Sequence, residues 1–479
     1  MYFRMLYDDQ LAQAAYLIGC QRTGEALIID PERDVERYIS AATREGLKIT
    51  AITETHIHAD YLSGSRELAE RTGARLYLSD AGDENWKYRW LDQKKGGGSY
   101  NHQLLRDGDS FKVGNIKIDT LHTPGHTPEH LSFLVTDLGG GANEPLGIVS
   151  GDFVFVGDVG RPDLLETAAG QEGAKEPAAR LLYHSLQRFK VLPEYLQVWP
   201  GHGAGSACGK ALGAVPQSTV GYEKRFNAAI AAAANEQQFV QTILEGQPEP
   251  PLYFARMKQE NKNGPALLEK FPEPMPLTAN ALRELLAHNA TVVDTRSWKA
   301  FTQSHLPGAL WAPLTSYYAM ATGSYIQPGT PIYLLVEESQ LHNAVAGLIR
   351  IGLDHVAGYI TPEVFAEYQK QGGKTASTAF VPIANVNDEM KKGNARVLDV
   401  RGAAEFEAGH LKGAMNIAYT RLPLHLHELP KEQTYLLHCR TDNRSAIAAA
   451  LLQRHGYNVV HLGGGMAEWQ AQQGEVVKA

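Results

Sequence analysis

The stretch TETHIHADYLSG, residues 53–64, places two histidines and an aspartate at alternate positions: His56, His58 and Asp60. A tyrosine, Tyr61, takes the next place. The stretch follows the apolar run ITAITET, so the loop after a strand can aim these side chains into one pocket. Imidazole and carboxylate groups are common metal ligands in proteins. The spacing therefore favours a metal site over isolated structural histidines.

Three later clusters supply further ligand candidates. LHTPGHTPEH contains His126, IVSGDFVFVGD contains Asp152 and VWPGHGAGSACG contains His202. Each cluster follows an apolar run and is flanked by glycine, which lets the backbone turn tightly into a pocket. Together with the first stretch, these clusters predict a metal site built from loops at the ends of strands.

The first half of the chain alternates strand-like and helix-like segments. Helices are predicted for DVERYISAATREG and SGSRELAERTG. The expected strands are EALIID, KITAITETH, ARLYLS, IKIDTLHT, LSFLV, LGIVSGD and LQVWPGH. The proline-rich segments EGQPEPPLYF and FPEPMP predict a boundary near residue 268, and hence a first domain over residues 1–268.

The second half of the chain repeats itself. VVDTRSWKAFTQSHLPGALWAP (292–313) and VLDVRGAAEFEAGHLKGAMNIA (397–418) match at five pairs that lie 105 positions apart, Asp294/Asp399, Arg296/Arg401, Phe301/Phe406, His305/His410 and Gly308/Gly413. In each copy strands alternate with helix-like segments, which predicts a small α/β domain around a parallel sheet. The polar link KQGGKTAS suggests domains over 269–372 and 373–479.

A cysteine ends a strand in the second copy, in YLLHCRTDNRSAIAAALLQRHG. A helix is expected to begin near Ser445, so Cys439 lies at the base of a loop whose amides converge at a helix N-terminus. The helix dipole, Arg440 and Arg444 should favour the thiolate, which is the reactive form of cysteine. We expect Cys439 to be a sulfur nucleophile rather than a buried structural residue.

The other two cysteines, Cys20 and Cys208, lie far apart in the chain and do not suggest a disulfide framework. Cys20, in the apolar segment AAYLIGC, is expected to be a small buried hydrophobic residue. Cys208 follows His202 by six residues, so a loop can bring it beside the metal. Its sequence context leaves both a structural and a sulfur-handling role open.

Composition limits the possible partners. Of the 479 residues, 43% are hydrophobic and 20% are charged, and the net charge is −8, which argues against a nucleic-acid-binding surface. No apolar run approaches the 18 or so residues of a membrane span. The first residues, MYFRMLYDDQLAQ, lack the pattern of a signal peptide. We therefore expect a cytoplasmic protein, and we also expect a homo-oligomer.

The order HxHxD, PGH, GD and GH resembles the metallo-β-lactamase superfamily, over roughly residues 1–260. The resemblance implies an αββα sandwich with metal at the sheet edges. Two-metal members such as glyoxalase II-type hydrolases carry a histidine where Tyr61 stands. The segments SGD and GRPDL (160–164) are instead similar to the persulfide dioxygenases. That family implies one iron, held here by His56, His126 and Asp152.

Two imidazoles and a carboxylate are the expected ligands of a non-haem Fe(II) oxygenase, because they leave positions open for O₂ and substrate. Spacing alone also allows a zinc site that includes His58, and a phenol oxygen as a ligand. If the metal is iron, Tyr61 indicates a chemistry different from that of the two-metal hydrolases. A set of polar residues would then orient ligands, bound water or substrate. This set comprises His58, Asp60, Tyr61, His202 and Cys208.

Arg161 and Asp163, in GRPDL, have two interpretations. They can form a surface salt bridge, or Arg161 can lie near an anionic substrate. The similarity to the persulfide dioxygenases favours the second interpretation.

The cysteine loop is similar to that of the rhodanese family, with LDVR, GHLKGAMNI and LGGGMAEW around it. The loop comprises Cys439, Arg440, Thr441, Asp442, Asn443 and Arg444, followed by Ser445. Rhodanese loops usually carry glycine where Asp442 stands, so the acceptor preference can differ. In the first copy, Glu337 takes the place of the cysteine, in LVEESQLHN, and no arginine fork is present there. The middle domain therefore resembles an inactive rhodanese.

The whole chain resembles a persulfide dioxygenase–rhodanese fusion: α/β throughout, with an αββα sandwich followed by two rhodanese-like α/β domains. The resemblance implies one Fe(II) per chain, a small-molecule thiol persulfide and O₂ as substrates, and sulfite and thiosulfate as linked species. Fusion raises the effective concentration of a reactive intermediate at the second site. The alternatives are a zinc-dependent thioester hydrolase of glyoxalase II type and a non-catalytic persulfide carrier.

Overall fold

A computed structural model of the chain describes residues 1–168, 170–210 and 212–478. The chain divides into two compact units, residues 1–271 and 272–479. The division falls within the proline-rich segment expected to separate domains. Both copies of the repeat lie in the second unit, so the boundary near residue 372 stays a prediction. Within the described ranges, no helix is both long enough and apolar enough to cross a bilayer.

The first unit contains two six-stranded sheets. One has the order β1-β2-β3-β4-β5-β6, with bounds Tyr2–Asp8, Gln13–Cys20, Glu25–Ile29, Lys48–Thr53, Arg75–Ser79 and His102–Leu105. The other has the order β12-β11-β10-β9-β8-β7, with β7 to β12 at Ser110–Val113, Ile116–His122, Leu131–Asp137, Gly147–Gly151, Gln197–Pro200 and Ser218–Thr219. Strands β3 to β6 are parallel, as are β10 and β11. Their carboxyl ends lead into the loops that carry the candidate ligands.

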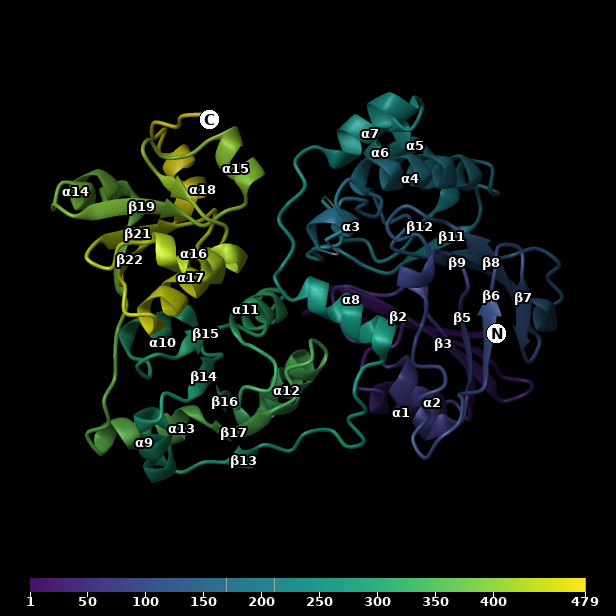
Figure 1. Ribbon diagram of the computed structural model, residues 1–479, viewed down its shortest axis with the longest axis horizontal. Helices are drawn as coiled ribbons and strands as arrows, with labels where there is room; N and C mark the ends of the chain where they lie inside the picture. Colours follow the sequence, from purple (N-terminus) through teal and green to yellow (C-terminus); the bar gives the residue numbers. More distant parts are fainter. Residues whose placement is uncertain (169, 211, 479) are drawn as a thin grey trace. The chain divides into compact units, whose positions relative to one another are not determined.

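Helices cover the outer faces of the two sheets (Figure 1). Helices α1 and α2 lie on one side, at Glu36–Arg44 and Ser65–Thr72, and 3₁₀ turns occur at Glu84–Trp86 and Leu138–Gly140. The other side carries α4 to α7, at Lys175–Lys190, Val220–Phe226, Ala228–Ala232 and Glu236–Leu244. Short helix α3 is Leu164–Thr167, and α8 is Phe254–Asn263.

Three apolar layers hold this arrangement together. Tyr38 of α1 packs in the layer under the first sheet, Phe133 of β9 lies between the sheets, and Phe239 of α7 packs in the layer over the second. All three side chains are buried, and burial of this kind contributes about 25 cal/mol for each Å² of apolar surface. The expected αββα sandwich is confirmed, whereas the N-terminal hairpin of β1 and β2 and helices α3 to α8 were not anticipated.

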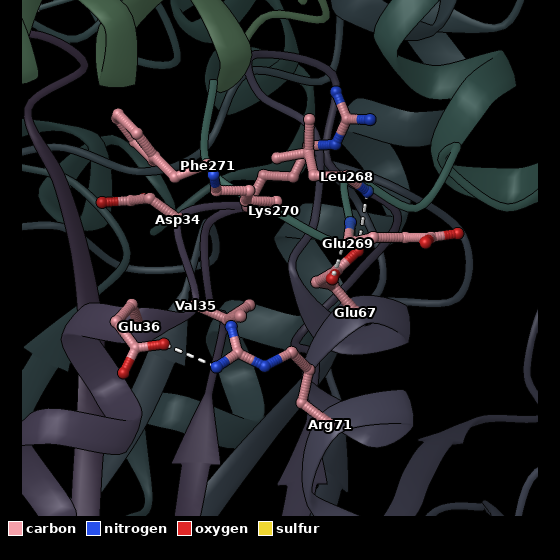
Figure 2. Close-up of a pocket in the computed structure, with 10 residues that line it drawn as sticks. Asp34, Val35, Glu36, Glu67, Arg71, Leu268, Glu269, Lys270 and Phe271 are labelled. Atoms are coloured by element: carbon pink, nitrogen blue, oxygen red, sulfur yellow. Dashed lines mark hydrogen bonds and ion pairs between the residues drawn. The ribbon is translucent and has the colours of Figure 1, made fainter. Parts of the chain in front are cut away.

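The C-terminal segment of the first unit is fixed against α2 (Figure 2). The carboxylate of Glu67 accepts hydrogen bonds from the backbone N–H groups of Leu268 and Glu269, at 2.8 and 3.2 Å. Arg71 pairs with Glu36 on the neighbouring helix α1 at 2.6 Å. A small cavity lies among these residues, and none of its lining residues belongs to the candidate metal site. This segment serves to close the first unit.

The second unit contains two five-stranded parallel sheets of matching strand order, β13-β17-β16-β14-β15 and β18-β22-β21-β19-β20. We call the part from β13 to α13 the first repeat and the part from β18 to α18 the second repeat. In the first repeat, the strands are Met275–Pro276, Thr291–Asp294, Leu310–Trp311, Ile332–Leu335 and Val356–Ile360. In the second, they are Ala379–Pro382, Ala395–Asp399, Met415–Asn416, Thr434–His438 and Asn458–Gly463.

Helices alternate with these strands, as the pattern predicted. The first repeat has α9 to α13 at Ala279–Ala287, Trp298–Gln303, Tyr317–Tyr325, Leu341–Ile349 and Pro362–Lys370, with a 3₁₀ turn, η3, at Glu338–Gln340. The second has α14 to α18 at Val386–Met390, Ala403–Ala408, Leu422–His425, Asn443–Arg454 and Gly465–Ala471, with 3₁₀ turns at Ile383–Asn385, Tyr419–Arg421 and Leu426–Glu428.

The matched residues of the repeats make the same contacts. Asp294 and Arg296 pair at 2.6 Å after β14, and Asp399 and Arg401 pair at 2.6 Å after β19. Each arginine also donates to a backbone carbonyl eight residues further on, which fixes the turn that leaves the strand. The ring pairs Phe301/His305 and Phe406/His410 both stack, with centroids 3.8 and 3.7 Å apart. The sequence repeat is thus a structural repeat.

Candidate metal centre and cysteine loop

The loop that follows β4 is held by an aspartate outside the quoted stretch. Asp30, at the end of β3, accepts hydrogen bonds from the Thr55 backbone N–H at 2.7 Å and from the Thr55 hydroxyl at 2.9 Å. Its Oδ1 also lies 3.1 Å from His58 Nε2. Because the Thr55 hydroxyl gives its one hydrogen to Asp30, it must accept from His56 Nδ1, 2.9 Å away. The lone pair of His56 is therefore on Nε2.

The second sheet supplies the other candidate ligands at the ends of β8 and β10. His126 Nδ1 lies 3.0 Å from the backbone carbonyl of Arg161, which can only accept, so His126 also has its lone pair on Nε2. Asp152 follows Gly151, whose φ is +54° and where a Cβ would lie 2.6 Å from Thr55 Oγ1. Glycine is thus required for the turn that brings Asp152 beside the loop of β4.

His56, His126 and Asp152 meet in one buried cluster, in which one ligand atom from each lies within 4.8 Å of the others. Asp152 Oδ2 is 3.5 Å from His126 Nε2 and 4.0 Å from His56 Nε2. His56 Nε2 and both Asp152 oxygens are buried and make no hydrogen bond with the described part of the chain. Two imidazoles and a carboxylate this close together, with unpartnered buried atoms among them, fit a metal ion.

Burial keeps both imidazoles neutral, as metal binding requires. It lowers the pKa of His126 to about 3 and that of His56 well below its ordinary value. Burial also raises the pKa of the Asp152 carboxyl to about 6 in the metal-free protein. A bound cation would reverse this last effect, because it favours the ionised carboxylate.

Asp60, His202 and Cys208 form a second buried group beside the first. His202 Nε2 lies 3.2 Å from Asp60 Oδ2 and 3.5 Å from Asp152 Oδ1, so it bridges the two groups. Burial raises the pKa of the Cys208 thiol well above its ordinary value. The expectation that a loop brings Cys208 toward the metal ligands agrees with this placement.

His58 and Tyr61 both contact Asp30, through His58 Nε2 and the Tyr61 hydroxyl. Burial disfavours the charged form of His58, but the Asp30 carboxylate outweighs it and raises the pKa of His58 to about 9. The Tyr61 hydroxyl donates to the Asp30 carbonyl at 3.3 Å and accepts from Gln13 Nε2 at 3.2 Å. A phenol engaged in this way supports the loop, and this geometry does not favour a phenol ligand.

Arg161 and Asp163 form a buried pair rather than a surface salt bridge. The Arg161 side chain is 1% exposed, and its Nε and Nη2 lie 3.0 and 2.6 Å from the Asp163 carboxylate. Its remaining hydrogen bonds go to the carbonyls of Ala207 and Pro248. The guanidinium therefore stabilises the loop before Cys208. Its hydrogen bonds are made to groups of the protein rather than directed at a substrate.

Several residues that hold the site were not predicted from the sequence. Glu129 Oε1 accepts from the Ile57 backbone N–H at 2.7 Å, and His130 Nε2 accepts from the Asp152 backbone N–H at 3.0 Å. Asn261, on α8, bonds to the loop of β4 at three points. The histidine lies in the PEH of the PGH cluster and could have been noticed, whereas α8 gave no signal because it is distant in sequence.

A narrow pocket reaches His126 from the side of α8. Trp86 and Lys258 line it together with apolar side chains of the β4 loop and of α3. Lys258 is 5% exposed, and its Nζ lies 3.6 Å from the centroid of the Trp86 ring. Burial lowers the pKa of Lys258 to about 8, with Glu129 opposing the effect. The pocket thus offers a buried cation beside a candidate metal ligand.

Cys439 directly follows β21 and is 1% exposed. The helix that follows, α17, begins at Asn443, two residues earlier than expected. The Ser445 hydroxyl lies 3.4 Å from Cys439 Sγ. The cysteine therefore lies at the N-terminus of a long helix, where the helix dipole favours a sulfur anion.

The two arginines of the loop differ in their surroundings. Arg444 makes a two-point pair with Glu405 of α15, in which Nη2 lies 2.9 Å from Oε1. This pair lowers the pKa of Glu405 against the effect of burial, so the carboxylate stays ionised. Arg440 is exposed. The expected arginine fork is thus partly neutralised by a glutamate from outside the loop.

Asp442 adopts a conformation that favours glycine, with φ of +92°. Its Oδ1 accepts a hydrogen bond from the Gly464 backbone N–H at 2.8 Å. This bond offsets part of the strain and engages the carboxylate with the backbone of Gly464. In the first repeat, Glu337 is exposed and is followed by the 3₁₀ turn η3 in place of an amide-lined loop.

The fold and the ligand clusters define a class of metal-binding α/β sandwich joined to a sulfurtransferase-like domain. Residues 8–202 match the model of the metallo-beta-lactamase superfamily, and residues 383–472 match that of the rhodanese-like domain. The chain belongs to the metallo-beta-lactamase superfamily and carries a rhodanese-like domain. It is 42% identical to a metallo-beta-lactamase of Staphylococcus aureus in a crystal structure, with a TM-score of 0.66, over 76% of this chain and 99% of that one.

Two curated relatives differ in the activity that their names state. A hydroxyacylglutathione hydrolase of Nitrosococcus oceani is 33% identical over 39% of this chain and 60% of its own length. The mitochondrial persulfide dioxygenase ETHE1 of Bos taurus is 24% identical over 42% of this chain and 67% of its own length. The chain spans 53–62% of the length of some other curated relatives that it matches. The relatives thus leave two kinds of reaction open for the first unit, hydrolysis and persulfide oxidation.

Proposed function

We propose that the first unit oxidises the outer sulfur of a low-molecular-weight thiol persulfide with O₂, at one iron held by His56, His126 and Asp152. The observation that carries the proposal is the donor set: two neutral imidazole nitrogens and one carboxylate, buried and facing one another. This set leaves positions open for O₂ and a sulfur ligand, as in non-haem Fe(II) oxygenases. When bound, Fe(II) supplies the one-electron chemistry that reactions of O₂ require.

The overall reaction balances without another reductant. A thiol persulfide, O₂ and water give the thiol, sulfite and two protons, so the outer sulfur supplies all the electrons that O₂ takes up. The chain must therefore bind an anionic sulfur species beside O₂. The buried ammonium of Lys258, in the pocket beside His126, supports such binding because it offers a positive charge in an apolar site.

The rhodanese-like domain transfers sulfane sulfur through Cys439 in this proposal. The thiolate attacks the outer sulfur of thiosulfate, the S–S bond of thiosulfate breaks, and sulfite leaves with the bonding electron pair. The product is a cysteine persulfide anion, stabilised by the helix N-terminus. Sulfite is thus common to both reactions, which supports their occurrence in one chain of sulfur metabolism.

A zinc-dependent thioester hydrolase is the second candidate, because a hydroxyacylglutathione hydrolase is among the relatives. Tyr61 argues against a two-metal hydrolase, since it stands where such enzymes carry a histidine and its hydroxyl is bonded to Asp30 and Gln13. Metal analysis of anaerobically purified protein separates the two candidates. One iron per chain supports the dioxygenase, and two zinc ions support the hydrolase.

Two variants test the proposal on the full chain. Asp152→Ala should lose bound iron and all O₂ uptake with a thiol persulfide, while Cys439 still accepts sulfur, because the two units have separate cores. Cys439→Ser should lose sulfur transfer from thiosulfate and keep O₂ uptake. Cys20→Ser, the loss of a buried thiol in β2, is the matched control and should keep both activities. Full O₂ uptake by Asp152→Ala would refute the ligand assignment.

A third variant tests the first repeat. Glu337→Cys introduces a thiol at the position that corresponds to Cys439, and no persulfide should form there, because the flanking segment ESQLHN offers no arginine to hold the anion. Mass spectrometry after incubation with thiosulfate reads out both positions. A persulfide on Cys208 but never on Cys439 would contradict the rhodanese assignment. It would also exclude the simple carrier, which needs Cys439.

A further inference from the structure

The first repeat lacks a cysteine, yet one of its side chains contacts the neighbourhood of Cys439. Trp298, the first residue of α10, lies edge-on to His461 of β22, with ring centroids 5.1 Å apart. Its indole Nε1 donates a hydrogen bond to His461 Nδ1 at 3.4 Å. A tryptophan indole can only donate, so Nδ1 of His461 must be the unprotonated nitrogen.

This contact decides where the hydrogen of His461 is. His461 is fully buried, and burial lowers its pKa to about 4, so the ring is neutral at physiological pH. A neutral imidazole with a bare Nδ1 carries its hydrogen on Nε2. His461 Nε2 lies 2.9 Å from the Ser445 hydroxyl oxygen, so the imidazole donates to the serine.

The serine hydrogen is then free to point at the reactive sulfur. The Ser445 hydroxyl has two acceptors besides the imidazole, the Asp442 backbone carbonyl at 2.8 Å and Cys439 Sγ at 3.4 Å. A sulfur anion is the stronger acceptor, because hydrogen bonds to charged groups are about twice as strong as neutral ones. In the opposite tautomer, His461 Nε2 would itself accept the serine hydrogen, and the sulfur would lose its donor.

We propose that the first repeat is a positioning domain for the cysteine of the second, in which Trp298 fixes the tautomer of His461 and thereby directs the Ser445 hydroxyl to the sulfur of Cys439. The chain of contacts runs from Trp298 Nε1 through His461 and Ser445 to Sγ. The inference rests on the proposed function only in assigning sulfur transfer to Cys439. Trp298 touches no reacting atom and is a positioning residue.

Other charged and titratable groups face Cys439 and must be held constant in a test. Arg444 forms an ion pair with Glu405, and the positive charge of Arg444 interacts with the sulfur of Cys439. Tyr317 of α11 and Tyr419 of the second repeat also interact with Cys439, and burial raises the pKa of both phenols, so they stay neutral. Trp298→Phe leaves all four in place, because it removes one N–H and retains an aromatic ring.

The test measures alkylation of Cys439 by iodoacetamide against pH, read by mass spectrometry on the full chain. In Trp298→Phe the midpoint of the alkylation profile should rise by about one pH unit, the shift expected when a hydrogen bond to an anion is weakened. Sulfur loading from thiosulfate near neutral pH should fall about tenfold. Trp311→Phe is the matched control. The ring centroids of Trp311 and Trp298 are 5.0 Å apart, but the Trp311 indole donates to the Arg296 carbonyl. The alkylation midpoint of Cys439 in Trp311→Phe should therefore not change.

Two further measurements keep the inference falsifiable if Trp298→Phe is merely less stable. Ser445→Ala should raise the midpoint similarly, and adding Trp298→Phe to it should raise it no further, because both act through the same hydrogen bond. Nitrogen chemical shifts of the imidazole, assigned by loss of signal in His461→Gln, should show the Nε2–H form in the native protein and a mixture in Trp298→Phe. An unchanged midpoint or an unchanged tautomer in folded Trp298→Phe would overturn the inference. Alkylation does not depend on sulfur transfer, so failure of the proposed function alone would leave these results intact.

Discussion

Asn261 offers a sharp test of how the metal loop is held. Its Oδ1 accepts from the Ser63 backbone N–H at 2.8 Å, and its Nδ2 donates to the carbonyls of His58 and Tyr61 at 2.8 and 2.7 Å. The side chain is 1% exposed, so water cannot replace these bonds. Asn261→Asp keeps the shape and the acceptor but replaces the donating NH₂ by an oxygen that faces two carbonyl oxygens.

The magnitude follows from the two carbonyl groups left without a donor. A buried acceptor without a partner costs about 1–3 kcal/mol, so the change should destabilise the folded loop by roughly 2–6 kcal/mol. About 1.4 kcal/mol corresponds to a factor of ten in a binding constant. Metal binding requires the folded loop, so part of this cost is lost from the free energy of binding. The affinity for iron should therefore decrease by at least about tenfold. Asn261→Ala should have a smaller effect, because it adds no repulsive oxygen.

The assay is iron content per chain after dialysis against a weak chelator, together with thermal unfolding. Asn263→Asp, the same chemical change at an exposed position of α8, is the control and should keep its iron. Iron content in Asn261→Asp equal to that of the native protein would refute the argument that α8 holds the loop. A decrease in unfolding temperature without loss of iron would show that the helix stabilises the fold and not the site.

Four further outcomes are expected. Tyr61→His should raise metal content above one per chain and reduce O₂ uptake, whereas one iron with normal turnover would show that this position does not control nuclearity. Asp442→Ala should lower the free energy of unfolding by about 1.5–3 kcal/mol, because it loses the bond to Gly464 and keeps the strained φ, and Asp442→Gly should be nearly neutral, as chemical denaturation can measure. His461 has a pKa of about 4 when folded against about 6.5 when unfolded, so the unfolded state binds more protons between these values. Stability of the second unit should therefore fall as pH decreases from 6.5 to 4, by up to roughly 3 kcal/mol, and His461→Gln should flatten this slope. Lys258→Met should raise the KM for an anionic persulfide about tenfold with little change in kcat, and an unchanged KM would exclude contact with the substrate.

The sequence predicted the parts of the site that follow strands. Asp152 comes directly after β10, and His126 comes four residues after the end of β8, where apolar runs end in glycine-flanked polar clusters, so alternation and glycine positions were sufficient signals. The cysteine loop was predicted for the same reason, because a strand, a cysteine and a helix follow one another without interruption. Local pattern therefore identified residues that meet in the candidate metal cluster and the cysteine that precedes α17.

Side chains that arrive from distant elements were not predictable. Asn261 is 200 positions from Tyr61, and no periodicity links a helix to a loop so far away. Glu405, which pairs with Arg444, lies in another helix of the repeat. The interpretation of Arg161 as a surface residue was wrong for a similar reason. Arg161 is buried, and it donates a hydrogen bond to the carbonyl of Pro248, which lies 87 positions further on. Tertiary contacts decide such roles, and a single sequence records them only weakly.

Helix α8 has a consequence for dividing the chain. The match to the superfamily model ends at residue 202, but Lys258 and Asn261 lie well beyond it, on a helix that this model does not include. A fragment cut at residue 202 would retain His56, His126 and Asp152 and lose the bonds that fix the loop before them. The shortest piece of the chain that can be expected to hold a metal therefore extends through residue 263, and the segment clamped by Glu67 would be a natural place to end it.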